Sequence, residues 1–204
     1  MRNFLCGYTL GMAEAKNDAD QVWMTSAMLK AYAHPLRRQM IRLFSRREHL
    51  RAADVAADLD VPANSASFHL RVLADAGLIE EAPEHARDRR DRVWKSRRGS
   101  FNVGGPEHPV PDEALGTAMV RSVADDHQDM LNRVVAWTPE YLSGRAAEVH
   151  AHFSQRMVRL TEAEFEAVME RVQEVITEAV DAHDKDDPAG RSWQVDILAA
   201  DDTI

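Results

Sequence analysis

Residues 62–76 place small polar side chains beside an apolar stripe, and helical spacing separates the two kinds. At about 100° per residue, Leu70 and Leu73 fall on the same side as Ala66. The opposite side and its flanks carry Asn64, Ser65, Ser67, Phe68 and Arg71. Asn can pair with adenine, Arg with guanine or phosphate, and an apolar ring can meet the thymine methyl group. This set predicts a helix whose outer face contacts base edges in duplex DNA.

Neighbouring elements must hold such a helix at the surface. Residues 52–59 are predicted to form a short amphipathic helix whose apolar side packs on the stripe. A tight turn at residues 60–62 follows, and Gly77 stops the second helix at its C-terminal capping position. Two short helices joined in this way are typical of a helix-turn-helix, which places the start of its second helix in the major groove.

A helical region is predicted upstream, over residues 21–47. Its break at His34-Pro35 marks a second segment, because proline is tolerated in the first turn of a helix. We expect His34 to be a structural cap at that break. His69 lies at the edge of the apolar stripe, where packing or a backbone hydrogen bond is favoured over contact with a base.

A charged hairpin is predicted next, with strands at residues 78–82 and 92–96. A basic hairpin directly after a DNA-reading helix is typical of a wing, which lies on phosphates or in the adjacent minor groove. Acidic residues are interspersed, so a solvated loop is the alternative. The arginines expected to contact DNA are Arg87, Arg89, Arg90 and Arg92.

The net charge of −9 is divided unevenly along the 204 residues. Residues 30–98 hold 15 Lys/Arg against 10 Asp/Glu, whereas the remainder holds 10 against 24. Such asymmetry suggests that only the first part meets a polyanion. The single Cys6 excludes a disulfide framework, and no apolar run is long enough for a membrane span. We therefore expect a cytoplasmic protein, whose translation starts at Met1 or Met12.

A long helix is predicted over residues 112–137. Its apolar residues recur at three- and four-residue steps, as in a seam between two helices. The seam predicts a homodimer, with Asp126 or His127 as a polar step that could set its register. Packing inside the same protomer, against the helix carrying Phe165 to Val180, is the alternative. The seam residues are Met119, Val123, Met130 and Val134.

The remaining C-terminal residues predict a small α+β unit. Thr161 and Glu164 form a capping-box pattern at the start of a helix, and residues 152–160 and 192–198 are predicted strands. Aromatic and Met residues in this half favour a core, with an effector pocket as the sharper hypothesis. The pocket candidates are Trp137, Tyr141, Phe153, Met157, Phe165 and Trp193.

Three stretches resemble, in order, the winged helix-turn-helix repressors of the ArsR type, in the actinobacterial branch with an added C-terminal domain. They are LKAYAHPLRRQMIRLF, AADVAADLDVPANSASFHLRVLADAGLIEE and DRVWKSRRGSF. The resemblance implies that residues 62–76 are the recognition helix and residues 87–95 the wing. Two departures stand out: Asp60 replaces the Gly common in the turn, and Pro62 replaces the Ser or Thr that often caps the helix.

Metal sensing through thiolates is excluded, because the helix at residues 52–59 has no cysteine. A histidine–carboxylate site would suit zinc or nickel. None of its histidines has a candidate partner at the helical i, i+4 spacing, so solvated side chains are favoured. We expect no metal, no cofactor and no enzymatic activity, since no phosphate loop or nucleophile motif is present. The candidate ligands are Asp125, Asp126, His127, Asp129, His150, His152 and His183.

Together these patterns predict a mostly helical α+β chain. We expect a disordered tail (1–20), a winged helix-turn-helix domain (21–103), a linker (104–111) and a dimerisation and effector domain (112–204). The function expected is sequence-specific DNA binding by a homodimeric repressor with a non-metal effector. A winged-helix protein-interaction module without DNA binding is the alternative.

Overall fold

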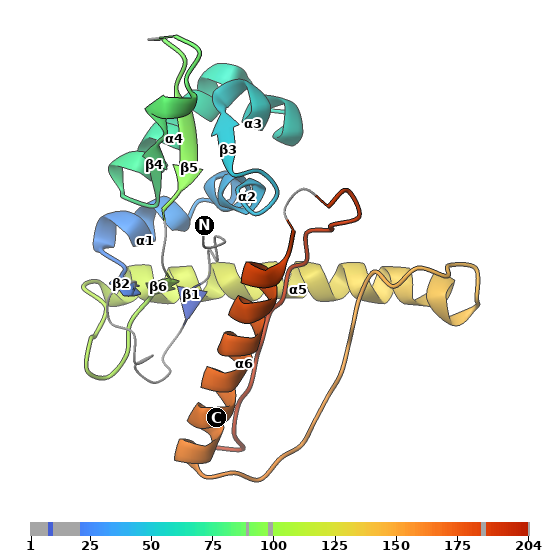
Figure 1. Ribbon diagram of the computed structural model, residues 1–204. Coiled ribbons are helices and arrows are strands. Elements are labelled where there is room, and N and C mark those ends of the chain that lie inside the picture. Colours follow the sequence, from blue (N-terminus) through green and yellow to red (C-terminus); the bar gives the residue numbers. More distant parts are fainter. Residues whose placement is uncertain (1–7, 10–20, 89, 98–99, 185–186, 204) are drawn as a thin grey trace.

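The computed structural model describes residues 8–9, 21–88, 90–97, 100–184 and 187–203 (Figure 1). The helices are α1 (Ser26–Tyr32), α2 (Pro35–Leu43), α3 (Ala52–Leu59), α4 (Ala63–Asp75), α5 (Glu113–Leu142) and α6 (Glu162–Ala182). The strands are β1 (Tyr8–Thr9), β2 (Gln21–Trp23), β3 (His49–Arg51), β4 (Ile79–Glu81), β5 (Val93–Ser96) and β6 (Ser100–Asn102). The prediction of a mostly helical α+β chain with a winged helix-turn-helix is confirmed.

Two small sheets frame the N-terminal domain. The antiparallel sheet has the order β3-β5-β4 and pairs Leu50 and Glu81 with Trp94. The parallel sheet has the order β1-β6-β2 and pairs Val22 with Phe101. The helix expected to begin at residue 21 is therefore wrong at its start, because residues 21–23 pair as a strand. The sheet also places Tyr8–Thr9 in β1; the other residues of the expected tail lie outside the described ranges.

One apolar core lies between α1–α4 and the antiparallel sheet. Helices α3 and α4 pack closely, and the apolar stripe of α4 lies in this core. Fully burying a large aliphatic side chain contributes about 1.5–3 kcal/mol, so this core dominates the stability of the domain. Its fully buried members include Leu29, Met40, Leu50, Val55, Leu70 and Leu73.

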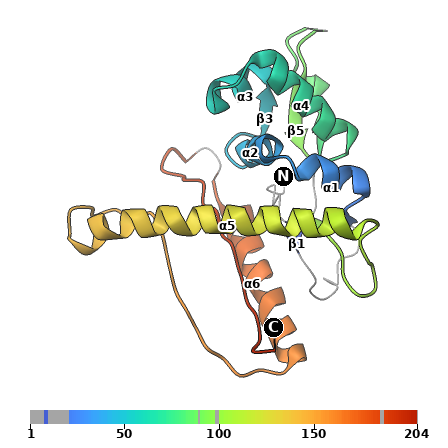
Figure 2. The same cartoon turned by 180° about the vertical axis from the view of Figure 1, so that it is seen from behind.

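Helix α5 crosses the N-terminal domain and continues beyond it (Figures 1 and 2). Asp112 caps its start by accepting a hydrogen bond from the backbone N–H of Leu115 (3.1 Å). Met119 is fully buried against the core, and Val123 packs on it. The predicted seam between protomers is thus wrong at these two residues, which face the same chain. The alternative is also wrong in its partner, since the first half of α5 packs on α1.

Helix α6 begins at the predicted capping box. Thr161 accepts from the N–H of Glu164 (3.3 Å), and the Glu164 carboxylate accepts from the N–H of Thr161 (2.8 Å). None of the 21 residues of α6 is buried. In both views the helix projects away from α5 and from the N-terminal domain (Figures 1 and 2).

The two strands predicted in the C-terminal half are wrong. Residues 152–160 and 192–198 have no regular secondary structure, and most of their large apolar side chains are exposed. A strand needs a neighbour to accept and donate its backbone hydrogen bonds, and no other described segment pairs with either stretch. Among the described helices, none is both long enough and apolar enough to cross a membrane.

Candidate DNA-binding interface

The second helix of the predicted helix-turn-helix is α4, and its two faces are separated as the spacing requires. Ala66, Leu70 and Leu73 are completely buried. Asn64 and Arg71 are exposed, and Phe68 is 54% exposed although it is a large apolar residue. Ser65 and Ser67 lie half-buried on the flanks. The outer face therefore presents short polar groups and one ring to solvent.

The ends of the helix-turn-helix are held by local backbone geometry. Asp60 adopts a left-handed conformation with φ 51°, in the position where the resembling family often has Gly. Pro62 is the N-cap of α4 and makes no side-chain capping bond. Gly77, with φ 78°, ends the helix: its N–H donates to Ala74 (2.8 Å) and that of Leu78 donates to Leu73 (3.0 Å). The predicted stop at Gly77 is confirmed.

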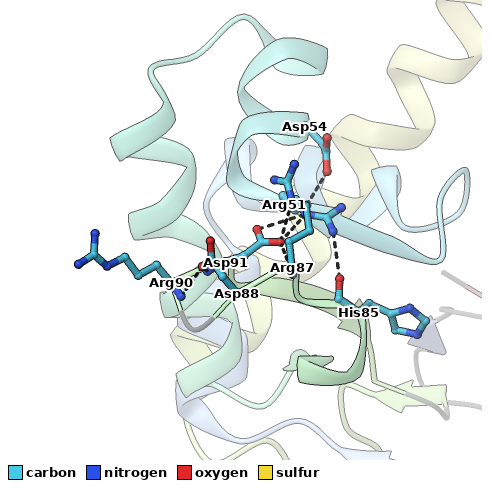
Figure 3. A network of polar contacts seen from close by, with 7 residues as sticks. All are labelled: Arg51, Asp54, His85, Arg87, Asp88, Arg90 and Asp91. Atoms are coloured by element: carbon cyan, nitrogen blue, oxygen red, sulfur yellow. Dashed lines mark hydrogen bonds and ion pairs between the residues drawn. The ribbon is translucent and has the colours of Figure 1, made fainter.

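The wing is organised by two aspartates (Figure 3). Asp91 accepts from the side chain of Arg51 (3.0 Å) and from both the backbone N–H and the side chain of Arg87 (3.0 and 3.1 Å). These bonds hold the pKa of Asp91 well below its usual range. Asp88 accepts from the N–H groups of Arg90 and Asp91 (2.7 and 3.0 Å). The acids that favoured a solvated loop instead give the wing its shape.

The network reaches back to the start of α3. Arg51 also donates to the backbone carbonyl of His85 (3.0 Å), and its own N–H is bound by Asp54 (2.7 Å). Arg51 thus connects β3, α3 and the wing in one cluster (Figure 3). Sequence reasoning missed both Arg51 and β3; the only signal was Asp54, three residues into a helix start, where an acid binds free N–H groups.

The four predicted wing arginines differ in what they offer a ligand. Arg87 is held by Asp91, and Arg92 forms an ion pair with Glu81 (3.4 Å). The Arg90 side chain extends away from the network (Figure 3), and its guanidinium forms no hydrogen bond or ion pair with the described residues. Arg89 lies outside the described residues. Arg90 is therefore the best placed of the described arginines for a phosphate.

His69 packs on His34 behind the outer face of α4. The ring centroids lie 4.8 Å apart, and the Phe68 ring meets His69 edge-on at 5.2 Å. Burial lowers the pKa of both histidines, and the charge of Arg37 lowers both further. The packing expected for His69 is confirmed. His34 is the N-cap residue of α2, as predicted, although its side chain makes no capping hydrogen bond.

The candidate effector residues are not brought together. The Trp137 and Tyr141 rings pack with centroids 5.0 Å apart and planes tilted by 33°, and His150 meets Trp137 edge-on. Phe165 is half-buried on α6, whereas Phe153, Met157 and Trp193 are exposed. Of the candidate metal ligands, His127 contacts Asp196 (3.3 Å) and His150 contacts Glu148 (3.7 Å). Within the described ranges, no group of three or more such side chains is placed to hold a metal ion.

Comparison with known proteins finds a family match for the N-terminal domain. Residues 32–82 match the family model described as a helix-turn-helix domain. The chain is 27% identical to the structure of a possible transcriptional regulator for arsenical resistance, covering 54% of this chain and 94% of that one (TM-score 0.31). It is 20% identical to an ArsR family transcriptional regulator, covering 52% and 88% (TM-score 0.29). It is 16% identical to the YusO protein of Bacillus subtilis, covering 78% and 83% (TM-score 0.33). No curated protein matches.

These TM-scores are low, so the class rests on the family match and on the geometry of α3, α4 and the wing. Together they define a winged helix-turn-helix domain, as found in DNA-binding transcriptional regulators. The family match confirms the helix-turn-helix that the resemblance implies for this domain, over residues 32–82. The C-terminal half lies beyond the matched residues.

Proposed function

We propose that this chain is a sequence-specific repressor that binds its operator as a homodimer and responds to a non-metal effector. The outer face of α4 carries the proposal. Three residues of α4 are completely buried and hold the helix in the core, so the exposed Asn64 and Phe68 are not needed for packing. The same face matches the donors, acceptors and methyl group of the major groove.

Each residue of the interface has its own part. Asn64, Ser65, Ser67 and Phe68, near the start of α4, contact base edges, because this end of a recognition helix enters the groove. Arg71 stands one turn further on, where its guanidinium reaches guanine or phosphate. On the wing, Arg90 contacts phosphate directly. Arg87 keeps the wing in shape through Asp91, and Arg92 adds positive charge at its base.

The first experiment compares two arginines of the same wing. Fragments of the source genome are selected for binding, and operator affinity is then measured against salt. Arg90→Ala should weaken binding to every sequence and reduce the salt slope by about 1, because one phosphate contact is lost. Ser67→Ala should instead change sequence preference. Arg145→Ala, far along the chain and paired with Glu140, is the control for a lost arginine.

Arg87→Ala is the second variant to compare. It removes the ion pair between Arg87 and Asp91, whereas Arg90→Ala removes a guanidinium that has no ion-pair partner among the described residues. It should weaken binding with a smaller change of slope than Arg90→Ala. If the wild-type chain binds no DNA fragment with a salt-dependent affinity, the repressor proposal fails. The protein-interaction module would then be the better account.

The second half of α5 supports the homodimer. Beyond Met130 it exposes Leu131, Val135, Tyr141 and Leu142, with Val135 61% exposed. A symmetric pair of recognition helices must be held about 34 Å apart, which calls for an interface between protomers. Val135→Glu should give a folded monomer with weakened operator binding in sedimentation and circular dichroism. Val168→Glu on α6 is the matched control, and an unchanged dimer in Val135→Glu would place the interface elsewhere.

The proposed effector site lies near the C-terminal end of α5. The packed Trp137 and Tyr141 rings, with His150 beside them, form an aromatic group suited to a planar or aliphatic molecule. Phe153, Met157, Phe165 and Trp193 would have to close around it. Release of operator by cell metabolites, and its loss in Trp137→Ala, would test this site.

A further inference from the structure

We propose that Asp126 of α5 is a positioning residue for DNA binding: through Arg38 it sets the α1–α2 turn against which α4 rests. The inference depends on the proposed function, since its consequence is measured in operator affinity. A path of contacts runs from Asp126 on α5 through Arg38 on α2 to His69 on α4. Neither Asp126 nor Arg38 belongs to the outer face of α4 or to the wing.

The first contact is a buried ion pair. Arg38 Nε lies 3.0 Å from Asp126 Oδ2, and the two residues are only 5% and 8% exposed. Arg42, one turn further along α2, contacts the same carboxylate oxygen. The sequence predicts Asp126 as a register residue between protomers, whereas the structure shows it bound to α2 of its own chain.

Such a pair fixes geometry because its partners cannot separate cheaply. A carboxylate removed from water is tolerated only when cationic donors satisfy it, and loss of one partner leaves a charge unpaired in the interior. Asp125 and Asp129 are exposed on the same helix and make no such contact with α2. Asp126 is therefore the carboxylate of this turn that ties α5 to the N-terminal domain.

The second contact carries the position of Arg38 to the turn between α1 and α2. Arg38 Nη1 donates to the backbone carbonyl of Ala33 (2.9 Å), the last residue before His34. Arg37 reinforces the same turn by donating to the carbonyls of Ala31 and Lys30. The turn therefore depends on two side chains of α2, and one of them is held by α5.

The third contact reaches the recognition helix. The His34 ring leaves this turn and packs on His69 of α4, which in turn meets Phe68 on the outer face. Among the described residues the buried His69 Nδ1 has no hydrogen-bond partner, whereas the ring packs on His34. A shift of α5 relative to α2 would thus change how the start of α4 is presented to DNA.

The experiment compares two neighbouring aspartates. Asp126→Asn keeps size and removes the charge, and Asp125→Asn is the matched control on the exposed side. Asp126→Asn should weaken operator binding by a factor of about 2 to 30, the range measured for residues that couple sites without touching ligand. The salt slope should stay unchanged, because no phosphate contact is lost. Asp125→Asn should leave both quantities unchanged.

A double-mutant cycle separates positioning from general destabilisation. Asp126→Asn and Arg38→Gln share one ion pair, so their combined fold-loss of affinity should be smaller than the product of the two single losses. Asp126→Asn and Arg90→Ala act at separate places, so their fold-changes should multiply. Multiplication in the first pair, or operator affinity unchanged in Asp126→Asn, would overturn the proposal.

A readout without DNA distinguishes this proposal from the proposed function. The ring resonances of His34 and His69 should move in the NMR spectrum of Asp126→Asn and stay in place in Asp125→Asn. If the wild-type chain binds no DNA but these resonances move, the repressor proposal fails while the contact path stands. If they do not move, the path is wrong. If Asp126→Asn does not fold, Asp126→Glu replaces it in this measurement. Its carboxylate lies one methylene further out, so it should also move the His34 and His69 resonances relative to the wild type.

Discussion

Helices α4 and α6 are similar as sequences and opposite as structures. Each carries an apolar stripe at helical spacing, and each has clear boundary residues. The stripe of α4 is completely buried, whereas the stripe of α6, from Phe165 to Val180, is at best half-buried. Periodicity thus reveals that a helix has an apolar face, but the other surface that covers this face must be supplied by the fold.

The same contrast runs along α5 itself. Its first half ends at Asp126, and there Met119 enters the core and the carboxylate binds α2. Its second half leaves the domain and exposes Leu131 and Val135. A single helix therefore contains both situations, and the boundary between them marks where the N-terminal domain stops.

The largest expected effect is a loss of stability, and it differs between the buried core and the exposed half of α5. Leu73→Ala in α4 should lower the free energy of unfolding by about 2–5 kcal/mol, because it leaves a cavity in a closed core. Leu131→Ala in the second half of α5 should cost less than about 1 kcal/mol, since its side chain is already 38% exposed. Urea unfolding of both variants at the same dilute concentration makes the comparison.

Raising the protein concentration sharpens the result. If a second copy covers α5, the cost of Leu131→Ala should grow with concentration, and that of Leu73→Ala should not. Equal costs for the two variants in dilute solution would contradict the division of the molecule into a closed core and an uncovered half of α5.

Much of the N-terminal domain could be predicted because its instructions are local. The break at His34-Pro35, the stop at Gly77 and the split faces of α4 each depend on residues within a few positions of one another. Strands β2, β3 and β6 could not be predicted in this way. Each has only three residues and exists because a distant segment pairs with it, as β2 does with β6.

The site shows the same limit. Arginines in the wing are visible in the sequence, but the pairing of Arg87 with Asp91 and of Arg92 with Glu81 is not. Arg51 and Asp126 act across 40 and 88 positions, to Asp91 and Arg38. No periodic pattern signals such pairs, since they depend on where the elements are packed.

A smaller effect is expected from the packed His34–His69 pair. Burial and nearby arginines lower both pKa values below the ordinary 6.5, so the unfolded chain takes up protons more readily than the folded chain. The stability contributed by the neutral rings is fully present above about pH 7 and is lost as the pH falls through about 6.5 and below.

The check is the free energy of unfolding between about pH 7 and 5. His69→Leu should flatten its fall over this range, because one of the two rings no longer takes up a proton on unfolding. His150→Gln, on the exposed side of the C-terminal half, serves as the control and should retain the wild-type slope. A wild-type stability that rises on acidification through this range would contradict the expected sign.

The smallest expected effect lies in the turn of the helix-turn-helix. Asp60 holds φ 51°, a region in which a side chain crowds the backbone and which glycine enters freely. Asp60→Gly relieves this crowding but loosens the unfolded chain, so the net gain should be only about 0.5–1 kcal/mol. Ala57→Gly, three residues earlier and exposed within α3, should lose about 1 kcal/mol, because glycine is unfavourable inside a helix. The stability of both variants is measured by thermal unfolding. If Asp60→Gly gains stability and Ala57→Gly loses it, the gain comes from the left-handed backbone at Asp60. A loss in both variants would show instead that the Asp60 side chain stabilises the turn more than its backbone conformation costs.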